Sequence, residues 1–217
     1  LGDTQCSRGS DSFTSLPRDD LTPVEFRIEK SDHNIDLSKI HMCISLQINR
    51  TDCKKHNKNI HAAAPINQIG YSLFSSANVY INNQRITTNQ SNYPFMTYCL
   101  NLMTTTQEEK VKNLETVGWI KDEGAVFDLI PEYNTKDKKM DQSLNGGFKE
   151  RQHFVNDKQS DTKSDIYYVP MIFDTYMLPR VLPNQTDVKI VLNRSDHEFC
   201  MMAKDEYKLS ILDARIY

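Results

Sequence analysis

Several features that commonly announce a function are missing from this sequence of 217 residues. It has no run of 18 or more apolar residues, the length that spans a bilayer as a helix, and residues 1–20 lack the basic and then apolar pattern of a secretory signal. An excess of charge of one sign is also missing, because 26 Lys and Arg against 29 Asp and Glu leave a net charge of -3. We therefore expect no membrane insertion and no direct binding of nucleic acid.

Cysteine is present, but not in a pattern that builds a framework. The five cysteines are an odd number, they are irregularly spaced and they include no CxxC pair. This argues against a disulfide scaffold and against a zinc ribbon. We expect reduced thiols in an intracellular protein.

Motifs of catalysis are missing as well. The chain has no GxSxG nucleophile elbow, no HxH pair of the cupin type, and no Gly-rich phosphate loop that continues into Lys and Ser or Thr. The segment NGGF, residues 145–148, lacks a flanking strand and helix and is interpreted as a turn. The sequence predicts that the protein is not an enzyme, with no catalytic residue, no metal site and no cofactor.

What the sequence does contain is the period of two that marks half-buried strands. Three segments show it, near residues 24–29, 41–49 and 187–194, and the last strand lies at 207–217. In that last strand, Tyr207, Leu209 and Ile211 alternate before Leu212, Ala214 and Ile216 take the opposite phase, which predicts a β-bulge. Pro170, in the strand pattern at 165–173, predicts an edge strand or a bulge.

Residues 72–88 predict a hairpin. Val79 and Ile81 alternate with polar residues, NNQ supplies the turn, and RITT would form the second strand. Aromatic residues on such strands, including Tyr80, Tyr167 and Tyr168, are more typical of cross-strand packing than of a ligand-binding surface.

Beyond the hairpin the period changes to that of a helix. Apolar residues recur at i, i+3, i+4, i+7 and i+8, which predicts a helix that buries one face made of Phe95, Tyr98, Cys99, Leu102 and Met103. Cys99 would then be an inert, buried thiol. A second helix is predicted after a capping box of Thr106 and Glu109, with Val111 and Leu114 as its apolar edge, ending near Gly118.

These elements give seven or eight strands, one helical excursion and no alternation of strands with helices. The predicted fold class is mainly β, an antiparallel β-sandwich of jelly-roll type with a short helical insertion. We expect a flexible N-terminal arm at residues 1–20, a single jelly-roll domain at 21–217, and surface loops between 124 and 163.

The order of segments resembles a family. The segments that carry the resemblance are IDLSKIHMCISLQI, APINQIGYSLFSSANVYINNQRITTNQSNYPFMTYCLNLM, GFKERQHF, and VKIVLNRSDHEFCMM with YKLSILDARIY. They are similar to the N-terminal jelly roll of the double jelly-roll major capsid proteins of Polinton (Maverick) elements and adintoviruses. The resemblance covers roughly residues 21–217. Its more specific positions are Pro65, Asn67, Ser72, Leu73, Phe74, Tyr80, Asn82, Tyr93, Pro94 and Asp213.

The resemblance implies a structural viral capsid protein that self-associates into capsomers and an icosahedral shell. Its partners would be copies of itself, as a trimeric capsomer formed with the second jelly roll, and penton or minor capsid proteins. It would be located in the virion after synthesis in the host cytoplasm or nucleus. The resemblance does not identify the assembly interface.

This sequence departs from the family in having strands for only one roll. Either it is part of a longer chain or the second roll has been lost, and a domesticated host protein is one form of the latter. The alternative function is a jelly-roll binding module that recognises a ligand or receptor through its loops, and a cupin-like metal enzyme is a third interpretation.

Overall fold

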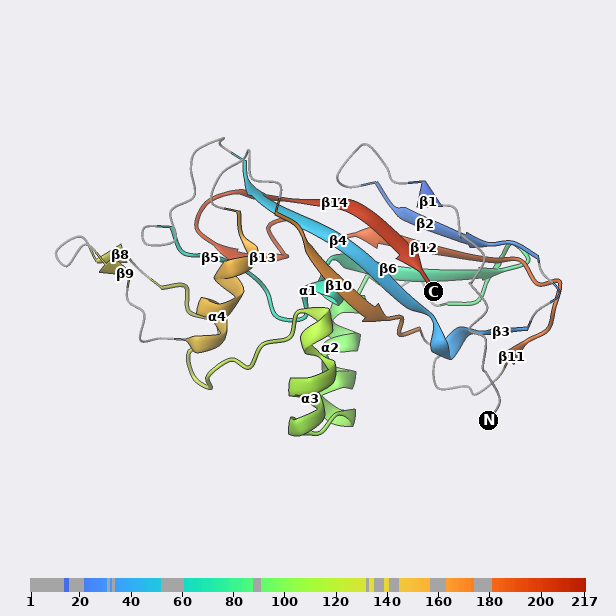
Figure 1. Ribbon diagram of the computed structural model, residues 1–217, viewed down its shortest axis with the longest axis horizontal. Coiled ribbons are helices and arrows are strands. Elements are labelled where there is room, and N and C mark those ends of the chain that lie inside the picture. Colours follow the sequence, from blue (N-terminus) through green and yellow to red (C-terminus); the bar gives the residue numbers. More distant parts are fainter. Residues whose placement is uncertain are drawn as a thin grey trace, which may run out of the picture.

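Two antiparallel sheets form the body of the computed structural model (Figure 1). The structure describes residues 14–15, 22–30, 32, 34–51, 61–87, 91–131, 133–134, 139–140, 145–156, 163–173 and 181–217. The larger sheet has the strand order β1 (Thr14–Ser15), β2 (Val24–Ile28), β12 (Val188–Arg194), β6 (Phe74–Ile81) and β7 (Gln84–Arg85). The other sheet has the order β10 (Asp165–Pro170), β4 (His41–Arg50) and β14 (Tyr207–Ile216).

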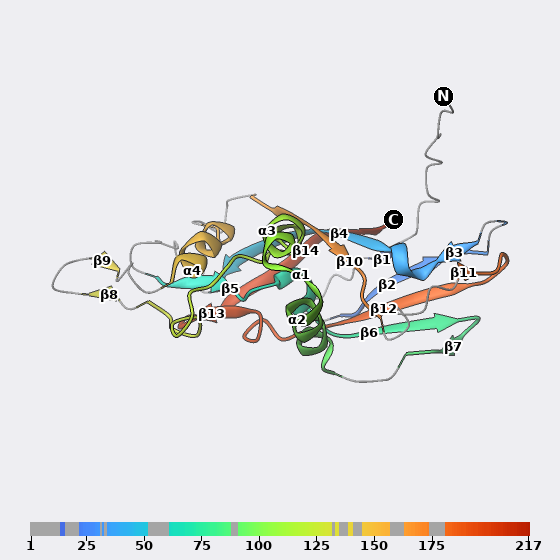
Figure 2. The same cartoon turned by 90° about the horizontal axis from the view of Figure 1, so that it is seen from below.

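The long strands alternate between these two sheets along the chain. Strands β2, β6 and β12 belong to the larger sheet, and β4, β10 and β14, which follow them in turn, belong to the other. In Figure 2, β4 and β10 run in a layer above β12 and β6. The chain is thus an antiparallel sandwich of jelly-roll type, and the predicted fold class is confirmed.

Shorter elements connect and flank the sandwich. Strand β3 (Ile35–Asp36) pairs with β11 (Val181–Leu182), β5 (Ala63–Pro65) with β13 (Met201–Ala203), and β8 (Tyr133–Asn134) with β9 (Lys139–Met140). The helices are α1 (Ile69–Ser72), α2 (Tyr93–Thr104), α3 (Gln107–Asn113) and α4 (Gly146–Arg151), with 3₁₀ turns η1 (Leu37–Lys39), η2 (Glu115–Val117) and η3 (Gln152–Phe154). Helices α2 and α3 project from one side of the sheets (Figure 1).

The inward faces of the two sheets meet in one hydrophobic core. The residues that the period of two places inside are buried, except for Ile28, which is partly buried. The buried ones are Val24, Phe26, Met42, Ile44, Leu46, Ile48, Val188, Ile190 and Leu192. Each fully buried side chain of this size contributes about 1.5–3 kcal/mol relative to an exposed one. Alternation of apolar and polar residues therefore fixes which face of each strand turns inward.

The predicted bulge is present in β14. Its register against β4 shifts between Ile211 and Asp213, so Leu212 has no partner in the ladder and is exposed. After the shift Ala214 and Ile216 are buried. Because the bulge adds one residue, the apolar residues after it, Ala214 and Ile216, face the core although they follow the opposite alternation.

The predicted hairpin is present but its second strand is shorter than expected. Asn82 and Asn83 have φ of 49° and 66°, the left-handed geometry of a two-residue type I′ turn. Only Gln84 and Arg85 pair back as β7. Beyond them the Ile86 N–H donates to the Val79 carbonyl at 2.9 Å, but the Val79 N–H donates to the Thr87 hydroxyl at 3.0 Å. Ile86 and Thr87 therefore do not continue the predicted strand, and Thr88 lies outside the described residues.

The interpretation of residues 145–148 as a turn is wrong. Asn145 caps helix α4 by accepting a hydrogen bond from the Gly147 N–H at 3.0 Å, and Phe148 is buried in the first turn. The region expected to be surface loop thus contains a packed helix. Its signal was an N-cap asparagine, although two glycines weaken the helix locally.

We predict that Gly147→Ala destabilises the protein by about 1–3 kcal/mol. A Cβ at this position would lie 2.6 Å from the Lys121 carbonyl oxygen and 2.6 Å from Asp122 Oδ1. Gly124→Ala is the matched control, because its Cβ would meet no atom within 4 Å. Urea unfolding of both variants checks this, and equal losses of stability would contradict the packing of α4 against residues 121–122.

Candidate functional site

The residues that carry the family resemblance gather mainly around α1 and its two flanking strands. Pro65 ends β5, Asn67 lies between β5 and α1, Ser72 ends α1, Leu73 is its C-cap, and Phe74 begins β6. Tyr80 lies near the far end of β6, Asn82 lies in the turn that follows it, and Tyr93 and Pro94 begin α2. Asp213 lies apart from them at the β14 bulge, 3.0 Å from Arg215.

A buried polar network fixes the first of these residues. Arg151 of α4 is fully buried, donates from Nε to the Pro65 carbonyl at 3.0 Å and pairs with Asp122 at 2.9 Å. Asn67 donates from Nδ2 to the other Asp122 oxygen at 3.0 Å and to the Ile120 carbonyl at 2.7 Å. We call Pro65, Asn67, Ile120, Asp122 and Arg151 the Arg151 network. It ties β5, the 120–122 segment and α4 together.

A second buried contact fixes helix α2 against α1. Gln68 has a left-handed backbone (φ 56°) at the N-terminus of α1 and is buried. Its Oε1 accepts a hydrogen bond from Asn101 of α2 at 2.9 Å. A left-handed non-glycine residue costs about 1–2 kcal/mol, so this geometry needs the support of the surrounding bonds.

The 72–74 segment is held from the other side by the turn at 195–200. The Cys200 thiol donates to the Ser72 carbonyl at 3.4 Å, and the Ser195 N–H donates to the Leu73 carbonyl at 3.0 Å. Phe74 is fully buried. These groups are all engaged in packing or backbone hydrogen bonds, and none forms a nucleophile with an adjacent base.

Aromatic residues join α2 to the core. The Tyr93 ring packs edge to face against Tyr71 with centroids 6.3 Å apart, and the Tyr71 hydroxyl donates to the Pro170 carbonyl at 3.0 Å. Burial raises the pKa of the Tyr93 hydroxyl above its ordinary value. Tyr93 therefore remains neutral at physiological pH, and both tyrosines act as packing residues.

Helix α2 forms as predicted, but the face expected to be buried is exposed. Phe95, Tyr98, Cys99, Leu102 and Met103 are all exposed. The prediction that this face packs on the core, and that Cys99 is a buried thiol, is therefore wrong.

The opposite face of α2 packs inward, and its buried residues are Tyr93, Pro94, Thr97 and Asn101. The polar members of that face are satisfied by hydrogen bonds, since the Thr97 hydroxyl donates to the Tyr93 carbonyl at 2.9 Å and Asn101 donates to Gln68. Burial of polar groups is tolerated when they find such partners.

Helix α3 begins with the predicted capping box. Thr106 accepts from the Glu109 N–H, and the Glu109 carboxylate accepts from the Thr106 N–H at 2.9 Å, which lowers the pKa of Glu109. Leu114 is buried, whereas Val111 is exposed, so only half of the predicted apolar edge packs.

The reactivity of Cys99 reports whether the outer face of α2 is exposed, and the buried Cys200, outside α2, serves as the reference. We predict that iodoacetamide at pH 8 alkylates Cys99 in the folded protein but leaves Cys200 unmodified. Cys99 is exposed, whereas burial raises the pKa of Cys200 to about 12, so very little thiolate forms. Peptide mass spectrometry before and after unfolding in urea checks this, and protection of Cys99 in the monomer would contradict the orientation of α2.

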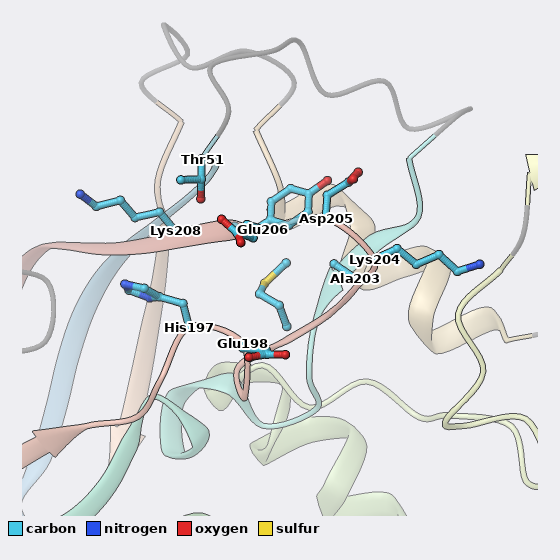
Figure 3. A pocket seen from close by; sticks show the side chains of 10 residues that line it. Thr51, His197, Glu198, Ala203, Lys204, Asp205, Glu206 and Lys208 are labelled. Atoms are coloured by element: carbon cyan, nitrogen blue, oxygen red, sulfur yellow. The ribbon is translucent and has the colours of Figure 1, made fainter.

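An open pocket lies near the β13–β14 connection (Figure 3). Its volume is about 620 Å³, and it is lined by Thr51, His197, Glu198, Met201, Ala203, Lys204, Asp205, Glu206, Tyr207 and Lys208. His197 and Glu198 face Asp205 and Glu206 across it, while the two lysines point outward (Figure 3). Asp205 pairs with Arg50 at 3.3 Å, and His197 Nδ1 accepts from the Leu209 N–H at 3.3 Å.

Half of the residues that line this pocket carry a charge. Its carboxylates and lysines are exposed to solvent, and that environment does not create the desolvated acid or base that catalysis needs. Among the described residues no group of three or more His, Cys, Asp or Glu side chains is placed to hold a metal ion. No helix in the described part of the chain has the length and apolarity to cross a membrane.

Comparisons with known proteins give structural neighbours only. No protein-family model matches the chain, and a search of curated proteins finds no match. Similar folds include VP54 of PBCV-1, in a crystal structure fitted into a reconstruction of the virophage Sputnik (TM-score 0.49, 12% identity, covering 95% of this chain and 41% of that one). They also include a quasi-atomic model of the PBCV-1 virus capsid (TM-score 0.46, 14% identity, 96% and 41%).

The mavirus major capsid protein is a third neighbour, with a TM-score of 0.48, 13% identity, and coverage of 100% of this chain and 47% of that one. This chain spans less than half the length of each of the three.

Proposed function

We propose that this chain is a structural viral capsid protein, the jelly-roll part of a major capsid protein, that self-associates into capsomers and an icosahedral shell. The observation that carries the proposal is the sandwich itself, in which β2, β4, β6, β10, β12 and β14 alternate between two sheets. The segments that form this sandwich are those that resemble the capsid proteins of Polinton elements and adintoviruses. We assign the chain to that lineage on the same resemblance.

The use of polar residues supports a structural role. Several polar side chains in or near the core form hydrogen bonds that hold one segment against another. They are Arg151, Asp122, Asn67 and Gln68. A shell protein needs such rigidity and no activated side chain. We propose that it is not an enzyme, that it needs no cofactor, and that it binds neither nucleic acid nor membrane.

The proposed partners are other copies of this chain, a second jelly roll, and penton or minor capsid proteins. The proposed location is the virion. The proposal applies both to a longer protein that carries a second roll and to a protein with one roll, because each would assemble through surfaces of this domain.

A second candidate is a binding module, and the polar pocket near His197 favours it. Such a module would stay small in solution and bind a small polar ligand saturably at the pocket. A capsid subunit would instead form large assemblies, with no ligand required.

Electron microscopy of negatively stained, concentrated protein distinguishes the two candidates. The capsid proposal predicts regular plates, rings or shells built from one repeating unit. Uniform single particles of monomer size at every concentration would contradict it and favour the binding module.

A further inference from the structure

The exposed row of α2 forms a continuous apolar surface. Phe95 is 61% exposed, Tyr98 41%, Leu102 44% and Met103 78%, and their spacing places them on one side of the helix. Phe199, 38% exposed, extends the surface because its ring packs edge to face on Phe95 with centroids 5.7 Å apart. We call Phe95, Tyr98, Cys99, Leu102, Met103 and Phe199 the α2 outer face.

All members of the α2 outer face except Phe199 lie in a stretch of sequence without charge. From Ile86 to Gln107 the chain contains no Asp, Glu, Lys, Arg or His, although charged residues make up 25% of the whole sequence. A helix face in permanent contact with water normally carries charged residues. Large exposed apolar patches on soluble proteins usually mark interaction sites.

Packing on the inner side fixes this orientation. Rotating α2 to bury the outer face would break the Asn101 to Gln68 hydrogen bond and expose Tyr93. The buried Lys110 of α3 also donates from Nζ to the Leu102 carbonyl at 3.2 Å, which satisfies the C-terminal end of α2. Burying the apolar face would break these hydrogen bonds, and they therefore hold it toward the solvent.

The area of the face matches one half of an interface between identical chains. At about 200 Å² for each large side chain, the exposed fractions correspond to about 500 Å² of apolar surface. An interface of standard size buries about 800 Å² per partner, and about 65% of a homodimer interface is apolar. Those two values also give about 500 Å².

We infer that the α2 outer face is a contact between two copies of this chain, with α2 of one copy packed on α2 of the next. A contact of identical surfaces places like residues near each other, and an uncharged face does so without repulsion between like charges. The inference rests on the proposed function, because it names the surface through which that self-association occurs.

Sedimentation velocity of three proteins under reducing conditions tests the inference: wild type, Leu102→Glu and the matched control Leu129→Glu. Both leucines are 44% exposed, but Leu129 lies in the loop before β8, away from α2 in the sequence. We expect wild type and Leu129→Glu to associate between about 1 and 100 μM, the weak end for interfaces of this size. Leu102→Glu should raise the dissociation constant at least about a hundredfold, because each contact would bury two carboxylates.

The outcomes separate this inference from the proposed function. If all three proteins assemble alike, the α2 outer face is not the contact, while self-association stands. If wild type is a monomer throughout, both are overturned. A bismaleimide cross-link mapped to Cys99 in two copies of wild type supports the inference, and cross-links confined to other cysteines contradict it.

Discussion

Replacing Phe26 with alanine is expected to lower the free energy of unfolding by about 3–5 kcal/mol. Phe26 is fully buried at the centre of β2, where it lies opposite Ile190 of β12 in the sheet and contributes to the core between the two sheets. Truncation would remove its apolar contacts and leave a cavity that a sheet cannot close without distorting its ladder. Urea denaturation, with an unchanged m-value, measures the loss.

Phe95→Ala is the matched control for this change. Sequence periodicity predicts a buried Phe95, whereas the structure exposes it on α2. We expect this variant to change stability by less than about 1 kcal/mol at protein concentrations low enough to prevent association. A loss as large as that of Phe26→Ala would mean that the α2 outer face packs on the core after all.

The second large effect is expected from Arg151→Met, which should destabilise the protein by about 3–5 kcal/mol. Methionine keeps much of the volume but removes the guanidinium that pairs with Asp122 and donates to the Pro65 carbonyl. The Pro65 carbonyl and the Asp122 carboxylate would lose a charged donor in a buried setting. Thermal and urea unfolding both measure this.

Arg27→Met provides the control for loss of an arginine. Arg27 also pairs with an aspartate, Asp187 at 3.2 Å, but its side chain is solvent-exposed. Exposed pairs are screened by water and contribute little, so stability should change within the error of the measurement. Similar losses for both variants would contradict the structural role of the Arg151 network.

The strands and their inward faces were predictable because both are local properties. Alternation along 24–28, 41–50 and 188–194 is decided by residues that are neighbours in the sequence, and the phase change at Leu212 marks the bulge directly. The turn at Asn82 and Asn83 was predictable for the same reason, since two asparagines accept positive φ.

The orientation of α2 could not be predicted from its own periodicity. The pattern of apolar residues is correct for a helix, but the face that packs is chosen by partners far away in sequence, above all Gln68 for Asn101. A sequence that buries threonine and asparagine while exposing phenylalanine and methionine departs from the usual pattern. Such departures are expected at functional surfaces.

The Arg151 network was missed for a similar reason. Arg151 follows NGGF in a polar stretch of the sequence. No neighbouring residue in the sequence indicates that its side chain binds Asp122 and the Pro65 carbonyl. The resemblance did single out Pro65 and Asn67, and the structure places both in this network. Their role as family-motif residues stays a prediction.

The solution mass of the wild-type chain, measured by light scattering coupled to size exclusion, tests the capsid proposal most directly. The proposal predicts a mass that rises with concentration to several times that of the monomer. A constant monomer mass over the whole concentration range would contradict self-association by this domain.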